Sequence, residues 1–311
     1  MVTSKDRPKK GGQHHRQHPH SQPHTHSQHQ HRPKHQKDET SSEQTNKSER
    51  HNFATDPTDH CESPLQAYQD AVVLLDFIAK ALGKDRSGLA VYDPYYCDGG
   101  VKRKLASLGF TNVWNENRDF YDDIATGSVP KHDVVVTNPP YSGQHMERLL
   151  TFCRQNRKPF LLLLPHFVYT KDYYGRALRG NDGRSKDVAG RKHDLFEKVF
   201  FVVPRARYLY TPPSWVDITR GSTALSKGKS QTAPFPTFWY CFIPAASDGW
   251  LQKTFGPSGK FDPTKSLHYA RTTDDIPREA KGEFDSSKKR PNPKARKRAA
   301  AKRRRLQGAG L

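Results

Sequence analysis

The chain has little cysteine and no long apolar run. Its 4 cysteines in 311 residues lie far apart and form no C-x-x-C pair, so neither a disulfide framework nor a zinc site is predicted. The longest apolar runs, 160–164 and 199–203, are too short to cross a bilayer, and the amino end carries no signal-peptide core. We therefore expect a soluble intracellular protein without a membrane partner.

Apolar side chains are almost absent from both ends of the chain. Residues 1–50 hold nine of the 16 histidines among Gln, Ser, Pro and Lys, with an irregular spacing that defines no metal site. Such segments bury too little surface to offset the entropy of ordering. We expect disordered tails at 1–55 and 276–311, and a single domain at 56–275.

The net charge of +20 is concentrated in these tails. Residues 288–305 contain eleven basic and no acidic residues, and residues 1–50 contain ten basic and five acidic ones, so about +4 remains for the rest. Flexible cationic tails attract polyanions without reading their sequence. The charge predicts a nucleic-acid partner, and the basic clusters also suit import into the nucleus or its nucleolus.

The middle of the chain alternates between helical and strand patterns. Ser63-Pro64-Leu65-Gln66 is a capping-box pattern ahead of a helix at 65–82. Expected strands lie at 89–92, 111–114, 133–137 and 160–164, and expected helices at 101–108 and 144–153. Later strands at 198–203 and 236–243 lack crossover helices. The pattern predicts an α/β fold whose mostly parallel sheet ends in antiparallel strands.

A short polar motif follows the strand at 133–137. Asn138-Pro139-Pro140-Tyr141 places a side-chain carbonyl, a backbone carbonyl fixed by proline and a flat ring at the carboxyl edge of the sheet. Open α/β sheets bind ligands at that edge. Two such oxygens can accept both N–H bonds of a planar amine while the ring stacks on the group that carries it.

In this context the motif resembles the catalytic motif of class I, S-adenosylmethionine-dependent amino-methyltransferases. Members act on adenine N6, guanine N2 or a glutamine amide. The resemblance implies a Rossmann-like fold, S-adenosylmethionine as cofactor, and catalytic roles for Asn138, Pro139, Pro140 and Tyr141, with Tyr141 also stacking on the target base. A proline-stiffened loop after a core strand is the alternative interpretation.

Residues 93–100 resemble the cofactor loop of the same family. The similarity implies that Asp93, Pro94, Tyr95, Asp98 and Gly99 contact the cofactor, although Cys97 stands where the family has its first glycine. The alternative interpretation of these residues is a simple Asp-Pro turn followed by a glycine at the start of a helix.

Further cofactor contacts follow the second expected strand. The resemblance implies that Glu116 binds ribose hydroxyls and that Asp119 and Phe120 contact adenine, although Glu116 is equally well read as a surface carboxylate. Only 17 residues separate Asp119 from Thr137, so we expect the third strand of the family to be reduced or missing.

Downstream residues complete the expected substrate site. The resemblance, which spans about residues 64–244, implies that the following residues lie beside the target base: His166, Phe167, Tyr169, Arg205 and Arg207.

The sequence thus favours methyl transfer to an exocyclic amine of a nucleic-acid base. RNA, including ribosomal RNA, is favoured over DNA because a small domain with basic tails suits a structured RNA. Two alternatives stay open: a protein glutamine N-methyltransferase, and a non-catalytic RNA-binding protein on a methyltransferase fold.

Deleting residues 288–311 tests the role of the basic tail. We expect weaker nucleic-acid binding and a flatter dependence of affinity on salt, because eleven cations are removed. Turnover on saturating substrate should continue. Binding titrations at several salt concentrations measure the affinity and its dependence on salt. An unchanged dependence would mean that the tail serves only as an import signal.

Overall fold

The computed structural model describes residues 61–180, 194–211, 231–233, 235–260, 262 and 264–282. All of them belong to one compact unit, Asn46–Leu311. The expected tail at 1–55 lies outside the described residues, and so do residues 283–311 of the expected tail at 276–311. Residues 181–193 and most of the segment between Thr211 and Phe235 are also outside them.

A seven-stranded mixed sheet forms the centre of the fold, in the order β2-β1-β3-β4-β8-β5-β9. The first four are parallel neighbours, whereas β8, β5 and β9 pair antiparallel. This α/β arrangement is compatible with a Rossmann-like fold, and it confirms the expected antiparallel end. The strands are β1 (Val91–Tyr92), β2 (Val113–Trp114), β3 (Val134–Thr137), β4 (Phe160–Pro165), β5 (Phe200–Pro204), β8 (Thr237–Phe242) and β9 (Leu267–Ala270).

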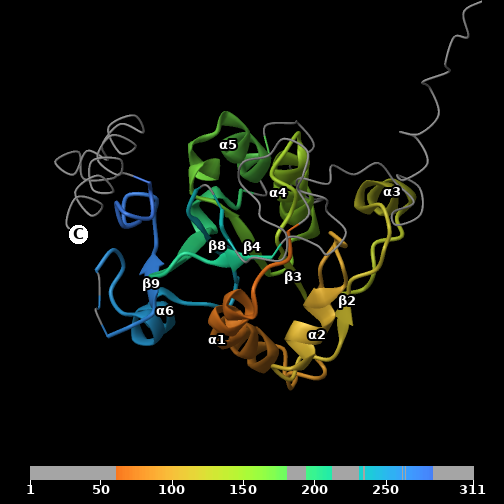
Figure 1. The fold of residues 1–311 in the computed structure, drawn as a ribbon, viewed down its shortest axis with the longest axis horizontal. Helices are drawn as coiled ribbons and strands as arrows, with labels where there is room; N and C mark the ends of the chain where they lie inside the picture. Colours follow the sequence, from red (N-terminus) through yellow and green to blue (C-terminus); the bar gives the residue numbers. More distant parts are fainter. Residues whose placement is uncertain are drawn as a thin grey trace, which may run out of the picture. The chain divides into compact units, whose positions relative to one another are not determined.

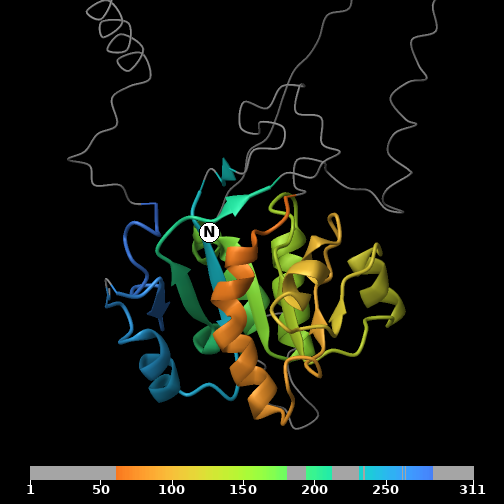
Figure 2. The same cartoon turned by 60° about the horizontal axis from the view of Figure 1, so that its bottom comes forward.

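Helices cover both faces of the sheet (Figures 1 and 2). One face packs against α1 (Leu65–Ala81), α2 (Gly100–Ala106) and α6 (Asp248–Phe255). The other packs against α3 (Phe120–Thr126), α4 (His145–Asn156) and α5 (Asp172–Arg179). Short 3-10 turns at His166–Thr170 and Phe196–Lys198, and a two-stranded sheet of β6 (Leu209–Tyr210) and β7 (Gln231–Thr232), complete the described elements. Within the described ranges no helix is long and apolar enough to span a membrane.

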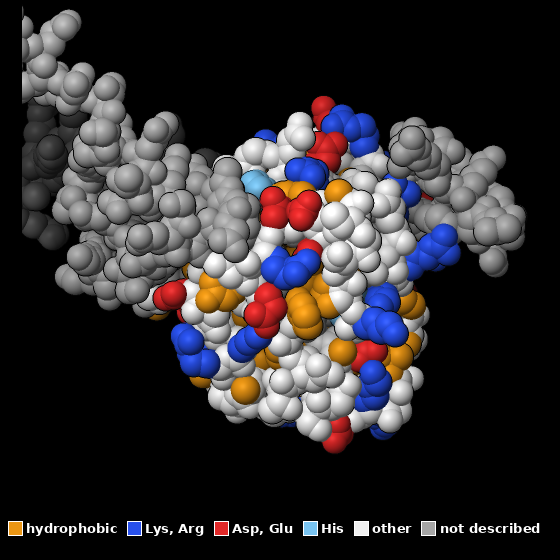
Figure 3. Space-filling model, turned by 90° about the vertical axis from the view of Figure 1, so that its right-hand side faces the viewer, with side chains coloured by type: hydrophobic (Ala, Val, Ile, Leu, Met, Phe, Trp, Pro, Cys, Tyr) orange, Lys and Arg blue, Asp and Glu red, His pale blue; other side chains and the backbone are white. Residues whose placement is uncertain are grey.

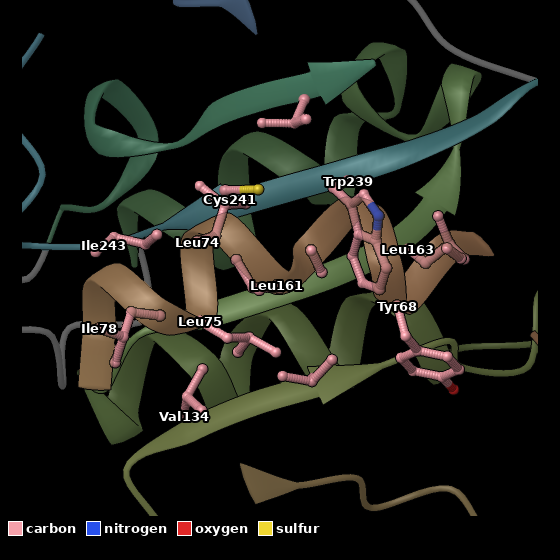
Figure 4. Close-up of a cluster of buried hydrophobic side chains, with 14 of the residues drawn as sticks. Tyr68, Leu74, Leu75, Ile78, Val134, Leu161, Leu163, Trp239, Cys241 and Ile243 are labelled. Atoms are coloured by element: carbon pink, nitrogen blue, oxygen red, sulfur yellow. The ribbon is translucent and has the colours of Figure 1, made fainter. Parts of the chain in front are cut away.

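The first of the two cores is centred on α1 (Figure 4). Leu74, Leu75 and Ile78 recur at helical spacing, and all three are buried against the sheet. Every residue of β4 is buried, as expected for a strand covered on both faces. Tyr68 lies at the end of this cluster, where the packed core gives way to the polar end of the sheet.

The connections create a switch point between β1 and β3. From β1 the chain passes through α2 to β2 on one side, then returns through α3 to β3 on the other side of β1. Residues 115–133 hold α3 but no strand, so β2 forms the edge of the sheet. Ligands bind at the carboxyl ends of strands beside such a point.

Some local expectations differ from the structure. α1 begins at Leu65 with Pro64 as its N-cap and no side-chain capping bond, so the capping box of Ser63 is not formed. α3, α5, α6 and β9 have no counterpart in the expected pattern. Ile276 is 2% exposed and belongs to the second core, so the packed chain runs past 275 into the range assigned to the tail.

Leu163→Ala tests the importance of β4 in the core. Leu163 is 0% exposed, and removing its buried methyl groups should lower the free energy of unfolding by about 2–5 kcal/mol. The matched control is Leu82→Ala, where the side chain is 48% exposed, and a much smaller change is expected. Urea denaturation measures both, and equal losses would contradict this packing.

Candidate functional site

The ends of β1 and β3 are joined by a buried hydrogen bond. Thr137 Oγ1, at the end of β3, donates to Asp93 Oδ1 at 2.6 Å, and the Tyr95 backbone N–H donates to the same oxygen at 3.1 Å. Asp93 and Thr137 are both buried. The loop that follows β1 is therefore fixed against the strand that carries Asn138.

Burial governs the ionisation of Asp93. Loss of hydration raises the pKa of this carboxyl to about 7, while the bonds from Thr137 and Tyr95 act in the opposite direction. Near neutral pH the group is therefore poised between its neutral and charged forms. A cation placed next to it would favour the charged form.

A pocket joins the Asp93 loop to the Asn138 motif. It combines residues from the segment before α1, the start of α1, the β1–α2 loop, the end of β2 and the end of β3. The lining residues are Cys61, Glu62, Ser63, Tyr68, Asp93, Tyr95, Cys97, Gly99, Gly100, Val101, Lys104, Asn115 and Asn138. The two motifs that the sequence singled out therefore face one cavity.

Glu62 fills much of this pocket. Its carboxylate accepts bonds from the Gly100 backbone N–H at 2.8 Å and from Lys104 Nζ at 2.6 Å. Its backbone pairs with Thr211 through N–H···O bonds of 3.0 and 3.3 Å. The remaining cavity of about 30 Å³ has room for one or two water molecules. A ligand of nucleoside size requires the Glu62 side chain to move.

Asn115 supplies a polar group that suits a ligand. Its Nδ2 donates to the Asp93 carbonyl at 3.1 Å and to the Tyr95 carbonyl at 3.4 Å. Asn115 lines the pocket, and its Oδ1 is buried and accepts no hydrogen bond from the described residues. A buried acceptor without a donor is costly, so this oxygen fits a ligand hydroxyl or ammonium group.

The Asn138 motif is held by its own tyrosine. Tyr141 Oη donates to Asn138 Oδ1 at 2.5 Å and approaches the Leu163 carbonyl at 3.4 Å. An amide oxygen has two lone pairs, so Oδ1 can accept one further bond. The Tyr141 hydroxyl thus orients the Asn138 amide, whose oxygen is the expected acceptor of an N–H bond from the target amine.

Three aromatic rings stand together next to this motif. The centroid of Phe235 lies 5.7 Å from that of Tyr141 and 5.1 Å from that of Phe167. All three side chains are partly exposed. We call Tyr141, Phe167 and Phe235 the aromatic rim. Rings of this kind offer a surface on which a flat base can stack.

Several expected cofactor residues lie away from the pocket lining. Glu116 is exposed and forms an ion pair with Lys102 at 2.5 Å. Asp119 caps α3 by accepting a bond from the Tyr121 N–H at 2.8 Å, and Phe120 is buried in the second core. Asp98, which is exposed, and Pro94, which is buried, also lie outside the lining. Gly99, in contrast, lines the pocket, and its φ is +69°.

The other expected substrate residues are spread over a wider area. Burial lowers the pKa of His166, whose ring lies against Gly282. The Tyr169 ring lies 6.2 Å from Phe201, in the antiparallel half of the sheet. Arg205 and Arg207 are exposed in the segment after β5.

Sequence reasoning missed Glu62, Asn115 and Phe235. Asn115 comes directly after the second strand, one residue before Glu116. The expected cofactor residue at this place was Glu116, but its neighbour Asn115 lines the pocket. Phe235 lies between two prolines ahead of β8, and only the fold places it beside Tyr141. Glu62 precedes the first helix, and no local pattern distinguishes it.

The edge formed by β2 and α3 carries mixed charge. Figure 3 shows acidic and basic side chains interspersed on this face. Lys102 of α2 pairs with Glu116 in the β2–α3 loop, and Arg118 of the same loop pairs with Asp123 of α3. This edge therefore offers a polyanion no continuous positive surface. Within the described part of the chain, no group of His, Cys, Asp and Glu is placed to hold a metal ion.

Comparisons with protein-family models, with curated proteins and with solved structures find no match to this chain.

Asp93→Asn tests the raised pKa. Because the pKa rises from 3.8 in the unfolded chain to about 7 in the folded one, stability from Asp93 is present at low pH and is lost as pH rises toward 7. The free energy of unfolding of the natural chain should exceed that of Asp93→Asn by an amount that falls as pH rises. Between pH 4 and 7 this difference should fall by about 1.4 kcal/mol for each pH unit. Urea titrations measure this difference, and a constant value would mean that Asp93 is ionised throughout.

Proposed function

We propose that the protein is an S-adenosylmethionine-dependent N-methyltransferase that acts on an exocyclic amine of a nucleic-acid base, with RNA favoured over DNA. The observation that carries the proposal is the single pocket that joins the Asp93–Gly100 loop to Asn138 at the switch point of the sheet. The resemblance of both motifs to one family supports the same assignment. The basic stretch at 288–305 supports a nuclear location.

The proposed chemistry rests mainly on positioning. Asn138 Oδ1 and the Pro139 carbonyl accept the two N–H bonds of the target amine, which orients its lone pair. Tyr141 holds the amide of Asn138 through its 2.5 Å bond, and the aromatic rim stacks on the base. When bound, the cofactor supplies a methyl group on a cationic sulfur, which makes a strong general base unnecessary.

The residues around the pocket fit the polar parts of this cofactor. Asp93 offers a carboxyl that becomes charged beside a cation, and Asn115 offers an unpaired buried acceptor. Gly99 and Gly100 let the backbone approach, and a Cβ at Gly100 would overlap the Glu62 carboxylate. Binding then requires the Glu62 carboxylate to leave Gly100 and Lys104.

A second candidate is a non-catalytic RNA-binding protein on the same fold. The observation that favours it is the ion pair of Glu62 with Lys104, which leaves about 30 Å³ in the pocket. Under this alternative Glu62 is a permanent structural group. Calorimetry with S-adenosylmethionine separates the two, because binding at one site excludes a permanently closed pocket.

The central test of the proposal is Asn138→Ala. We expect methyl transfer to total RNA to fall by at least about 100-fold, the scale of losing a positioned group at a reacting centre. Affinity for S-adenosylmethionine should change little, because Asn138 addresses the amine. The matched control is Asn112→Ala, in an exposed loop, which should retain activity.

Labelled methyl transfer to a cell extract that contains RNA, DNA and protein identifies the substrate class. Label that survives protease and is lost with ribonuclease supports an RNA substrate. Label that protease removes would indicate a protein substrate, as in the glutamine alternative. Label that only deoxyribonuclease removes would indicate a DNA substrate. Full activity of Asn138→Ala would overturn the proposed role of the motif.

A further inference from the structure

A second and larger pocket lies beside the first turn of α1. Its volume is about 840 Å³, at the upper end of the range of about 300–1,000 Å³ found for ligand sites. Its walls come from the start of α1, from residues 204–209 after β5, and from residues 264–266 ahead of β9. We call it the basic groove because of the charges on its walls.

Three cationic side chains line the basic groove: Arg205, Arg207 and Lys265. Lys265 Nζ donates to the Thr254 carbonyl at 2.9 Å, and the charge of Lys265 contributes to lowering the pKa of Asp262, after the effect of the Thr264 hydrogen bonds. Asp262 lies next to the groove but outside its lining, and accepts bonds from Thr264 N and Oγ1 at 2.9 and 2.6 Å.

The acidic residue among the described lining residues is Asp70, and its carboxyl is already engaged. Gln66 Nε2 donates to Oδ1 at 2.8 Å, and Tyr208 Oη donates to Oδ2 at 2.7 Å. The side chain is buried, and burial raises its pKa. The exposed charge of the groove lining is therefore positive.

The groove leads toward the aromatic rim. The Arg207 guanidinium donates to the carbonyl of Ala233, two residues before Phe235 of the rim. The positive charge of Arg207 also contributes to lowering the pKa of His166, after the larger effect of burial. Arg207 thus connects the lining of the groove to the segment that carries Phe235.

We propose, building on the proposed function, that the basic groove holds the sugar-phosphate backbone of the RNA strand that flanks the methylated base. Arginine forks bind phosphate oxygens in a bidentate manner. The amide of Gln66 and the hydroxyl of Ser266 add donors for phosphate or ribose oxygens. The strand then runs from the groove to the aromatic rim, where its base is extruded.

The test compares two triple variants of the full chain. The groove variant is Arg205→Ala, Arg207→Ala and Lys265→Ala. The control is Lys80→Ala, Arg103→Ala and Lys253→Ala, which removes the same charge from exposed sites on α1, α2 and α6. Fluorescence anisotropy with a labelled 20-nucleotide single-stranded RNA, without cofactor, gives the affinity of each at several salt concentrations.

We expect the groove variant to bind at least tenfold more weakly than the control at low salt. Its salt slope should be shallower by about two, since each phosphate contact on a single strand contributes about 0.7. Arg205→Glu alone should weaken binding further than Arg205→Ala, which guards against a general effect of the triple change. Equal affinities and slopes for the groove and control variants would overturn the proposal.

This measurement is independent of methyl transfer. If no methyl transfer is found but the groove variant loses RNA affinity, the proposed function fails and the groove assignment stands. If transfer occurs and the groove variant behaves as the control does, the function stands and the groove assignment fails.

Discussion

The hydrogen bond from Thr137 to Asp93 is the contact on which the site depends. It ties the loop after β1 to the end of β3, at the point where the chain reverses direction across the sheet. Both side chains are buried, so the bond is shielded from competing water. Asn138 is the next residue after Thr137, and its position relative to the Asp93 loop follows from this contact.

The same region shows how closely the protein fills its own pocket. Glu62 occupies the space next to Gly100, while Tyr141 uses one lone pair of Asn138. Asn115, in contrast, keeps a buried oxygen without a donor. The pocket therefore combines groups that are already paired with one that is not, which is the pattern expected where a ligand replaces internal contacts.

The charge of the chain is distributed in a similarly uneven way. Most of the excess lies at the two ends, and the β2–α3 edge pairs its acids with its bases. In the basic groove Asp70 is buried and hydrogen-bonded, so Arg205, Arg207 and Lys265 set the local field. Tails of this composition raise local affinity without defining a position, whereas a groove on the folded part defines one.

The sequence determined the order of the elements and the edge of the sheet that carries the polar motifs. Periodicity predicted α1 and the buried β4, because burial of apolar faces is a local pattern, and the lack of crossover helices predicted the antiparallel end. The short interval between Asp119 and Thr137 predicted too little chain for a further strand there, and residues 115–133 hold only α3. Only the tertiary structure decided which side chains share a pocket: Glu62, Asn115 and Phe235 approach the site from separate segments, while Glu116 turns outward to Lys102. Such contacts join residues far apart in the chain, so their geometry follows from packing and leaves no periodic trace in the sequence.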